Sequence, residues 1–491
     1  MPNTFAYLML MIWPLVCVVL FRRLAPERAM IWAILGGYLV LPPVAEFDLP
    51  LIPEMDKYSI ANISAFVIAM VVLRKKIPLW PQAGIARVLS ALFVLSVIPT
   101  VMTNGDPILF RVIPNSESIS FIVGQLPGLG LRDLLSVLAG QIIVLLPFFI
   151  ARQYLATSSG MRELVLAFAI GGLAYSIPAL IEIRLSPQIN IWVYGFFQHS
   201  FTQMMRGGGF RPIVFLPHAL WLAFFIVMAL LSAAALARNS DGATRTRWLI
   251  ATGYLAVILE LSKSLASLAY GLAFTPAILL FSRKMLIRLS VLLALTAVSY
   301  PMLRNAEIIP LDAILEQAMA IDPDREQSLG YRFDNENLLL ERADEKPWFG
   351  WGGWGRNLVR DLETGEIETI PDGRWIIVFG TFGWVGYIAE MGMLAFPLLL
   401  LGWRMRNLRN DQISPYVAPI VVILAATMFD MLLNATLIPL TWMCAGAILG
   451  YAERLNKPQS RFGAKPLFGD GPVIGATSGN HQGQKVRRPM L

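Results

Sequence analysis

The sequence predicts an all-α polytopic membrane protein with about thirteen transmembrane helices and one large loop domain. Hydrophobic residues make up 56% of the 491 residues and charged residues only 15%, whereas soluble domains usually carry about 25% charged residues. The mean hydropathy is +0.60. A single buried core cannot account for this over such a length, so many segments must have lipid as their solvent.

Thirteen predominantly apolar runs have lengths typical of membrane-spanning helices, which need roughly 20 residues. The first run lacks the charged start and small-residue cleavage site of a signal peptide, so we interpret it as a span. The predicted spans cover residues 5–21, 29–45, 58–73, 87–103, 134–151, 163–183, 213–237, 247–261, 264–282, 285–302, 375–402, 414–432 and 437–452.

The distribution of charge between the connectors predicts the orientation of these helices. Alternate short connectors and the C-terminal segment carry most of the 40 basic residues, whereas the loop 303–374 has sixteen carboxylates against eight basic residues. Because Lys and Arg are retained on the cytoplasmic side, we expect the C-terminus in the cytoplasm and the loop outside. The predicted organisation is ten helices in 1–302, the loop 303–374, three helices in 375–452, and a disordered basic tail in 453–491.

Several functional classes are disfavoured by composition. Cys17 and Cys444 both lie in apolar runs, which indicates small buried side chains and no disulfide framework. No residues have metal-ligand spacing, and nothing suggests a cofactor. The net charge of +7 follows from the bias of the connectors. Because no basic platform is interleaved with aromatic residues, nucleic-acid binding is not expected.

An arginine–glycine segment follows the sixth predicted helix. Arg206 and Arg211 flank three consecutive glycines, and Pro212 stands just before the next helix. Glycines let the backbone approach a ligand, arginines bind anions, and a helix N-terminus adds partial positive charge. The segment is therefore a candidate anion site; the alternative is a flexible turn with interfacial arginines.

The long loop contains two distinct patterns. Apolar residues at helical spacing in 332–342 predict an amphipathic helix. The run 346–357 alternates glycine with tryptophan, which suits neither a helix nor a strand and indicates flat apolar faces for stacking on sugars or for the membrane interface. The loop ends at Asp372, which is either a general base or a cap of the next helix.

Two carboxylates fall inside predicted spans. Glu390 and Asp430 lie within the eleventh and twelfth helices, where a charged group is costly and raises a functional hypothesis. Each is either a proton-relay group or a hydrogen-bond acceptor inside the bundle.

This layout resembles the O-antigen ligase and polymerase superfamily of bacterial envelope glycosyltransferases, which have about a dozen helices and a large periplasmic loop late in the chain. The run 347–352 matches the family's P-h-x-G-x-G element, and 372–386 matches the spacing of its H-N-x-hydrophobic…G-x-x-G element. The segments 206–212 and 262–264 are similar to its arginine-containing loop and its serine–arginine turn. The resemblance covers about 200–380 and extends to the earlier helices only by their number.

One departure from the family pattern concerns the position of its histidine. Asp372 stands there, and Gly373 replaces the following asparagine. In the ligases that histidine is thought to activate the acceptor hydroxyl. The departure therefore favours a polymerase-like protein over a ligase and leaves the identity of the base open.

The resemblance implies a metal-independent, polymerase-like glycosyltransferase in the bacterial inner membrane. It would join polyprenyl-diphosphate-linked oligosaccharide repeat units at the periplasmic face, as in exopolysaccharide or O-antigen synthesis, with the lipid bilayer, a flippase and chain-length or export proteins as partners. Alternatives are ligase-type transfer to another acceptor, a transporter or flippase for a lipid-linked glycan, and a non-catalytic scaffold of an export complex. The implied roles are diphosphate binding by Arg206, Arg211 and Arg332 with Lys263 or Arg374 assisting, catalysis by Asp372 first and Glu336 second, and glycan binding by Trp348, Trp351, Trp354 and Arg356.

Overall fold

A computed structural model describes residues 1–455 except 49–51, 113–121, 307, 322 and 362–363. From residue 456 onward the predicted tail lies outside the described residues. Residues 1–455 form one compact unit, in which each of the thirteen predicted segments is helical. The corresponding helices are α1 (Thr4–Arg23), α2 (Pro26–Val40), α3 (Lys57–Leu73), α4 (Gly84–Leu95) with α5 (Val97–Met102), α6 (Leu131–Tyr154), α7 (Ser158–Leu185), α9 (Ala219–Arg238), α10 (Gly242–Leu261), α11 (Leu265–Leu280), α12 (Arg283–Asn305), α15 (Arg374–Arg404), α16 (Val417–Asp430) and α17 (Pro439–Arg454).

Within the described residues, seven helical segments are long and apolar enough to cross a membrane, as expected for an all-α membrane protein. They are α1, the joined α4–α5 segment, α6, α7, α9, α12 and α15. The shorter helices α3, α11 and α16 are also apolar.

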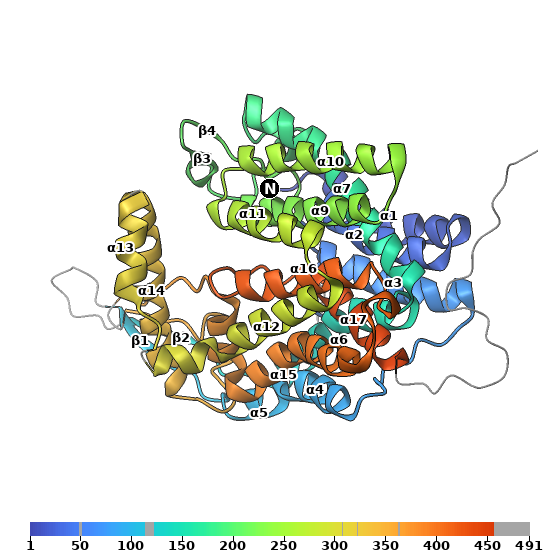
Figure 1. The fold of residues 1–491 in the computed structure, drawn as a ribbon. Coiled ribbons are helices and arrows are strands. Elements are labelled where there is room, and N and C mark those ends of the chain that lie inside the picture. Colours follow the sequence, from blue (N-terminus) through green and yellow to red (C-terminus); the bar gives the residue numbers. More distant parts are fainter. Residues whose placement is uncertain (49–51, 113–121, 307, 322, 362–363, 456–491) are drawn as a thin grey trace, which may run out of the picture. The chain divides into compact units, whose positions relative to one another are not determined.

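The core of the bundle is built by helices that are apolar on every side. Helix α9 has no polar face, and most of its residues are inaccessible to solvent. Helices α16 and α17 have the same character. A helix without a polar stripe is stable only when other helices surround it. Accordingly, α9 packs against α7, α10 and α11, while α17 packs against α6 and α15 (Figure 1).

The segment between the tenth and eleventh predicted spans contains two helices, α13 (Leu311–Ile321) and α14 (Pro323–Asp344), which pack against each other. Helix α14 includes the amphipathic helix predicted for 332–342 and is longer. It also packs against α15, so this segment belongs to the same compact unit as the bundle (Figure 1).

Several short elements were not predicted. Two antiparallel hairpins form, one from β1 (Ile108–Val112) and β2 (Ile122–Leu126), the other from β3 (Met205–Arg206) and β4 (Gly209–Phe210). Helix α8 (Ile189–Tyr194) precedes the second hairpin, and short 3-10 turns lie at η1 (Thr202–Met204), η2 (Met405–Asn407) and η3 (Asn410–Gln412).

Helix α15 is interrupted at Gly383, and the glycine–tryptophan run is inserted into the break. Gly383 has φ +63° and ψ −163°, which is not helical. The N–H groups of Trp351 and Gly352 donate to the carbonyls of Gly380 and Thr381, both at 2.9 Å, and the N–H of Trp384 donates to the Pro347 carbonyl at 2.7 Å. Backbone groups freed at membrane depth need protein partners. The glycine–tryptophan run supplies these hydrogen-bond partners.

We expect Gly383→Ala to prevent stable folding of this region. A Cβ at Gly383 would lie 2.3 Å from the carbonyl carbon of Trp348, and the positive φ adds strain. Overlap with backbone cannot be relieved by a rotamer change, so we expect a loss of about 3 kcal/mol or more. Thermal unfolding of the purified protein measures this effect. Gly253→Ala on α10, where a Cβ meets no atom within 4 Å, is the control; equal unfolding temperatures of the two variants would refute the expectation.

Candidate active site

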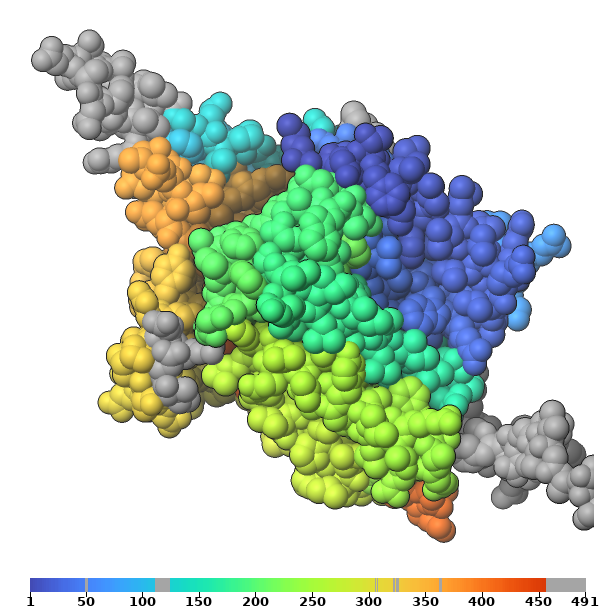
Figure 2. Space-filling view, turned by 90° about the horizontal axis from the view of Figure 1, so that it is seen from above, coloured from blue at the N-terminus to red at the C-terminus, as the bar shows by residue number. Residues whose placement is uncertain are grey.

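A polar cavity of about 1050 Å³ lies between two regions that are distant in sequence. One wall consists of the segment 199–221, and the other of α14, the residues before α15 and the turn between α16 and α17. In the space-filling view, the green segment around residue 200 lies between the blue N-terminal helices and the yellow α13–α14 pair (Figure 2). Among the described residues, the lining contains three arginines, Arg206, Arg211 and Arg332, and one carboxylate, Asp372.

The arginine–glycine segment forms the β3–β4 hairpin. Gly207 and Gly208, with φ +52° and +68°, are its two turn residues, a conformation that favours glycine at both positions. The segment is therefore an ordered hairpin. Lys263, at the turn between α10 and α11, donates from Nζ to the carbonyls of Arg206 (2.7 Å) and Gly207 (2.9 Å). Lys263 thus supports the hairpin, and it is not among the residues that line the cavity.

The chain after Arg211 is held by a fully buried carboxylate. Glu182 on α7 is inaccessible to solvent. One of its oxygens accepts hydrogen bonds from the N–H groups of Ile213 and Val214, both at 2.8 Å, and the other accepts from Ile189 at 3.1 Å. Val214 has φ +50°, a conformation that is strained for a β-branched residue. The carboxylate stabilises this otherwise unfavourable backbone.

Three further side chains complete the support of this segment. The Nζ of the fully buried Lys57 donates to the Phe215 carbonyl at 2.9 Å. The Tyr175 hydroxyl accepts from the Phe215 N–H at 3.0 Å, and the Gln198 amide donates to the carbonyls of Val214 and Leu216. Irregular backbone next to membrane helices requires such partners. The segment between Arg211 and α9 is therefore rigidly placed.

We expect Glu182→Gln to destabilise the protein by about 2 kcal/mol, because an amide oxygen cannot replace a carboxylate that accepts three buried hydrogen bonds. Glu163→Gln, on the same helix, breaks ion pairs to Arg28 and Arg162, whose side chains are 52% and 50% exposed, and should cost less than about 1 kcal/mol. Comparison of the unfolding curves in detergent tests this. Equal effects of the two substitutions would contradict the assigned role of Glu182.

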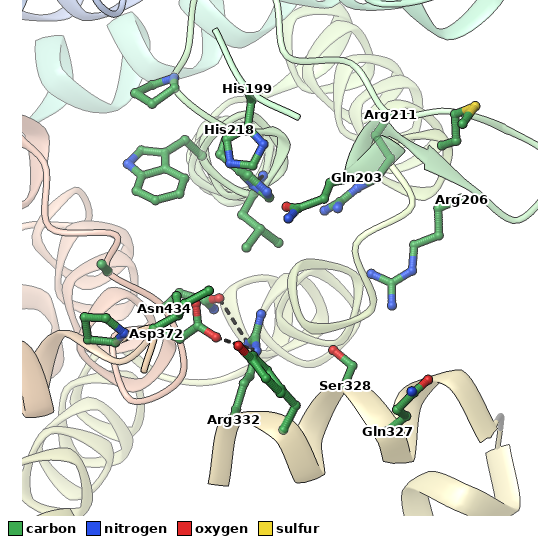
Figure 3. Close-up of a pocket in the computed structure, with 18 of the residues that line it drawn as sticks. His199, Gln203, Arg206, Arg211, His218, Gln327, Ser328, Arg332, Asp372 and Asn434 are labelled. Carbon is green, nitrogen blue, oxygen red and sulfur yellow. Dashed lines mark hydrogen bonds and ion pairs between the residues drawn. The ribbon is translucent and has the colours of Figure 1, made fainter. Parts of the chain in front are cut away.

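The opposite wall is organised around Arg332 of α14. Its Nε lies 3.3 Å from an oxygen of Asp372, and its Nη1 donates to the Leu433 carbonyl (3.1 Å) and to the Asn434 side chain (3.4 Å). Figure 3 shows this group facing the wall that carries Arg211 and His218. Since the N–H of Arg374 also donates to the Met431 carbonyl at 2.9 Å, the residues before α15 are tied to the turn after α16.

Asp372 is not a helix cap. Gly373 is the N-cap residue of α15, and no side chain caps this helix. The carboxylate of Asp372 lines the cavity and is 35% exposed. Partial burial raises its pKa, and Arg332 opposes that shift. A carboxylate with a raised pKa that remains accessible to a ligand can act as a general base.

Two histidines, His199 and His218, lie on the wall opposite Asp372, with ring centroids 4.5 Å apart (Figure 3). Burial and the nearby His199, Arg211 and Arg332 lower the pKa of His218 to about 3. Its Nδ1 accepts the N–H of Leu220 at 3.0 Å. A neutral imidazole carries a single proton, so Nε2 of His218 must bear it. His218 is therefore a hydrogen-bond donor there.

A second, more apolar cavity of about 400 Å³ adjoins the first. The two share Arg206, Arg332 and Asn434 in their linings. The walls of the second cavity come from α11, α13 and α14, together with the turn after α16. Its apolar lining residues are Leu220, Leu265, Ala266, Ala269, Ile314, Ala318, Leu329 and Leu433.

Two predicted site residues form polar contacts with other side chains of the protein. Glu336 is 4% exposed, lies near Tyr300, Trp375 and Arg304, and does not line the cavity. Burial raises the pKa of Glu336 to about 7. Arg374 donates two hydrogen bonds to Glu390, at 2.7 and 2.6 Å.

Both carboxylates that were predicted to lie within spans are hydrogen-bond acceptors. Glu390 accepts from Arg374, and Asp430 accepts from Asn434 at 3.0 Å and from Thr436 at 2.7 Å. Asp430 thereby orients Asn434, which contacts Arg332.

The residues predicted to line the glycan path lie around the glycine–tryptophan run and not in the large cavity. Trp348 and Trp354 are 64% and 54% exposed. Trp351 lies beneath Arg342, whose guanidinium carbon is 3.4 Å from the ring centroid. Arg356 is 2% exposed and donates to the carbonyls of Pro127 and Asp106, so it holds loops together.

The sequence reasoning did not assign several residues of the site, among them His199, Gln203, His218, Ser328, Tyr331 and Asn434. Two of the chain's three histidines border membrane segments, and that rarity was the available signal. Ser328 and Asn434 carried no such signal in the sequence, because serine and asparagine are common in helices and turns.

Comparison with known proteins adds no relative: no protein-family model matches this chain, and no curated protein matches it in sequence.

Proposed function

We propose that this membrane protein is a polymerase-like glycosyltransferase that joins polyprenyl-diphosphate-linked oligosaccharides at the periplasmic face of the bacterial inner membrane. The observation that carries the proposal is the convergence of Arg206, Arg211 and Arg332 on one cavity that also contains Asp372. Arginine has the planar fork that suits a diphosphate. Bond formation to a sugar hydroxyl additionally requires a base.

The adjoining apolar cavity supports an amphiphilic ligand. Arg206 and Arg332 line both cavities, so a diphosphate bound between them could extend a hydrocarbon chain along the walls formed by α11 and α13. A soluble anion has no hydrocarbon chain that could bury those apolar walls. The combination of cationic and apolar space favours a lipid diphosphate.

The proposed reaction assigns one role to each group. The acceptor hydroxyl oxygen attacks the anomeric carbon of the donor sugar, and its proton passes to the carboxylate of Asp372. The bond between that carbon and the diphosphate oxygen breaks, and the leaving polyprenyl diphosphate takes the electron pair. The arginines stabilise the developing negative charge, and the His218 Nε2–H donates a hydrogen bond to it. No step of this scheme requires a metal ion.

A reconstitution experiment tests the proposal. The purified protein in liposomes is given a polyprenyl-diphosphate oligosaccharide, and products are resolved on a gel. Oligosaccharides of increasing length on the lipid carrier support a polymerase. Transfer of the glycan across the bilayer without a change in length would instead indicate a flippase, and no effect on the substrate would favour a scaffold.

A further inference from the structure

A third cavity lies at the opposite ends of α12 and α15 from the candidate active site. It has a volume of about 380 Å³ and is bordered by the first turns of α12, the last turns of α15 and the η2 turn. Three cationic side chains line it, Lys284, Arg288 and Arg406, and the part of the chain that the structure describes adds no carboxylate to this lining.

The arrangement of these cations is unfavourable without a counter-charge. Lys284 and Arg288 are spaced i,i+4 on α12, where like charges repel. They also lie near the N-terminus of that helix, whose dipole disfavours positive charge, and its first turn has no acidic residue. Arg406 adds a third positive charge across the cavity. An anion bound between them would relieve this repulsion.

The position of the cavity indicates that the anion arrives from the bilayer. Both α12 and α15 are long and apolar enough to span a membrane, and the cavity lies at their ends. Trp403 is 58% exposed, and the Arg406 guanidinium lies 5.5 Å from the centroid of its ring. An exposed tryptophan beside an arginine at the end of a membrane helix is typical of an anchor at the membrane interface. Val291 and Leu399 line the cavity about one turn deeper in the two helices. They would contact the start of an acyl chain.

We propose that this cavity binds the headgroup of an anionic phospholipid, with its phosphate between Lys284, Arg288 and Arg406. Basic pockets between membrane helices commonly bind such headgroups. The site is separate from the candidate active site and does not depend on the glycosyltransferase proposal. It would fasten α12 to α15 on the side of the membrane away from the large cavity.

Native mass spectrometry of the detergent-purified protein tests this. Phosphatidylglycerol and phosphatidylcholine with identical acyl chains are added separately, and inorganic phosphate serves as a competitor. We expect a tight phosphatidylglycerol adduct, no comparable phosphatidylcholine adduct and little competition by phosphate. The triple variant Lys284→Gln, Arg288→Gln, Arg406→Gln should weaken the adduct about 100-fold, from about fivefold per cation.

The matched control is the triple variant Lys75→Gln, Lys76→Gln, Arg247→Gln, which removes three exposed cations elsewhere. It should bind phosphatidylglycerol as the unaltered protein does. Equal loss in both triple variants would overturn the site, as would unchanged binding in the first. Full competition by inorganic phosphate would show a simple anion site and also overturn the lipid assignment. Arg288→Glu, compared with Arg247→Glu, provides a second test with a single exposed substitution.

Discussion

Arg332→Ala is expected to lower the rate of polymer formation about 10²–10³-fold, the loss typical for removal of one electrostatic contact to a transition state. Arg332 lines both adjoining cavities and contacts Asp372 and Asn434. Its removal would leave a developing diphosphate charge less stabilised and the carboxylate without its partner. Arg332→Lys keeps the charge but loses the bidentate fork, so we expect an intermediate rate. The measurement is the rate of chain extension on lipid-linked oligosaccharide.

The control for this prediction is Glu341→Ala, an exposed position on the same helix α14 that does not line the cavity. It should retain the full rate. The amount of each variant in the membrane must be compared as well, because Arg332 also holds the turn after α16 through the Leu433 carbonyl. Normal ladders of chain length from a correctly inserted Arg332→Ala protein would refute diphosphate binding by this residue.

Asp372→Asn is expected to lower the rate about 10²–10⁴-fold, because an amide cannot accept the proton of the acceptor hydroxyl. A base works when deprotonated, so activity should rise with pH through the pKa of Asp372. Burial raises that pKa, which places the acidic limb of the rate profile above the range of an ordinary aspartate. Arg332 lowers the same pKa; Arg332→Gln should therefore move the limb to still higher pH. Rate measurements between about pH 4 and 8 test both statements.

Glu368→Gln provides the matched control, since Glu368 is an exposed carboxylate in the same loop and outside the cavity. It should change neither the rate nor the acidic limb. If Asp372→Asn keeps the wild-type rate and pH profile while the arginine variants are inactive, the base is another group. His199 is then the next residue to test, because it also lines the cavity.

The helices were predictable because their signal is local. A run of about 20 apolar residues has one stable environment, and each of the thirteen predicted segments is helical. The amphipathic pattern of 332–342 likewise marked part of α14. The two arginines beside the glycines were also recognisable, because Arg206, Arg211 and the turn that positions them are close in sequence.

The residues that face each other across the cavity were harder to predict from the sequence. Arg332, Asp372 and Glu336 were all predicted as site residues, but Glu336 faces Tyr300 and Trp375. Glu336 and Arg332 are four residues apart on one helix, and only the packing of α14 against α15 decides which of them reaches the cavity. The backbone of the glycine–tryptophan run forms hydrogen bonds with α15, a contact that the pattern of side chains in this run does not reveal.

The sequence by itself determined that this is a helical membrane protein, where its helices lie, and which long loop carries unusual residues, because hydrophobic length and charge are properties of neighbouring residues. Tertiary structure alone decided that Glu182 and Lys57 support the segment after Arg211, that Gly383 interrupts α15, and that His218 and Asn434 share a cavity with Asp372. These relations join residues up to 216 positions apart. They arise from hydrogen bonds to irregular backbone and from the packing of distant segments, for which composition and periodicity leave no local trace.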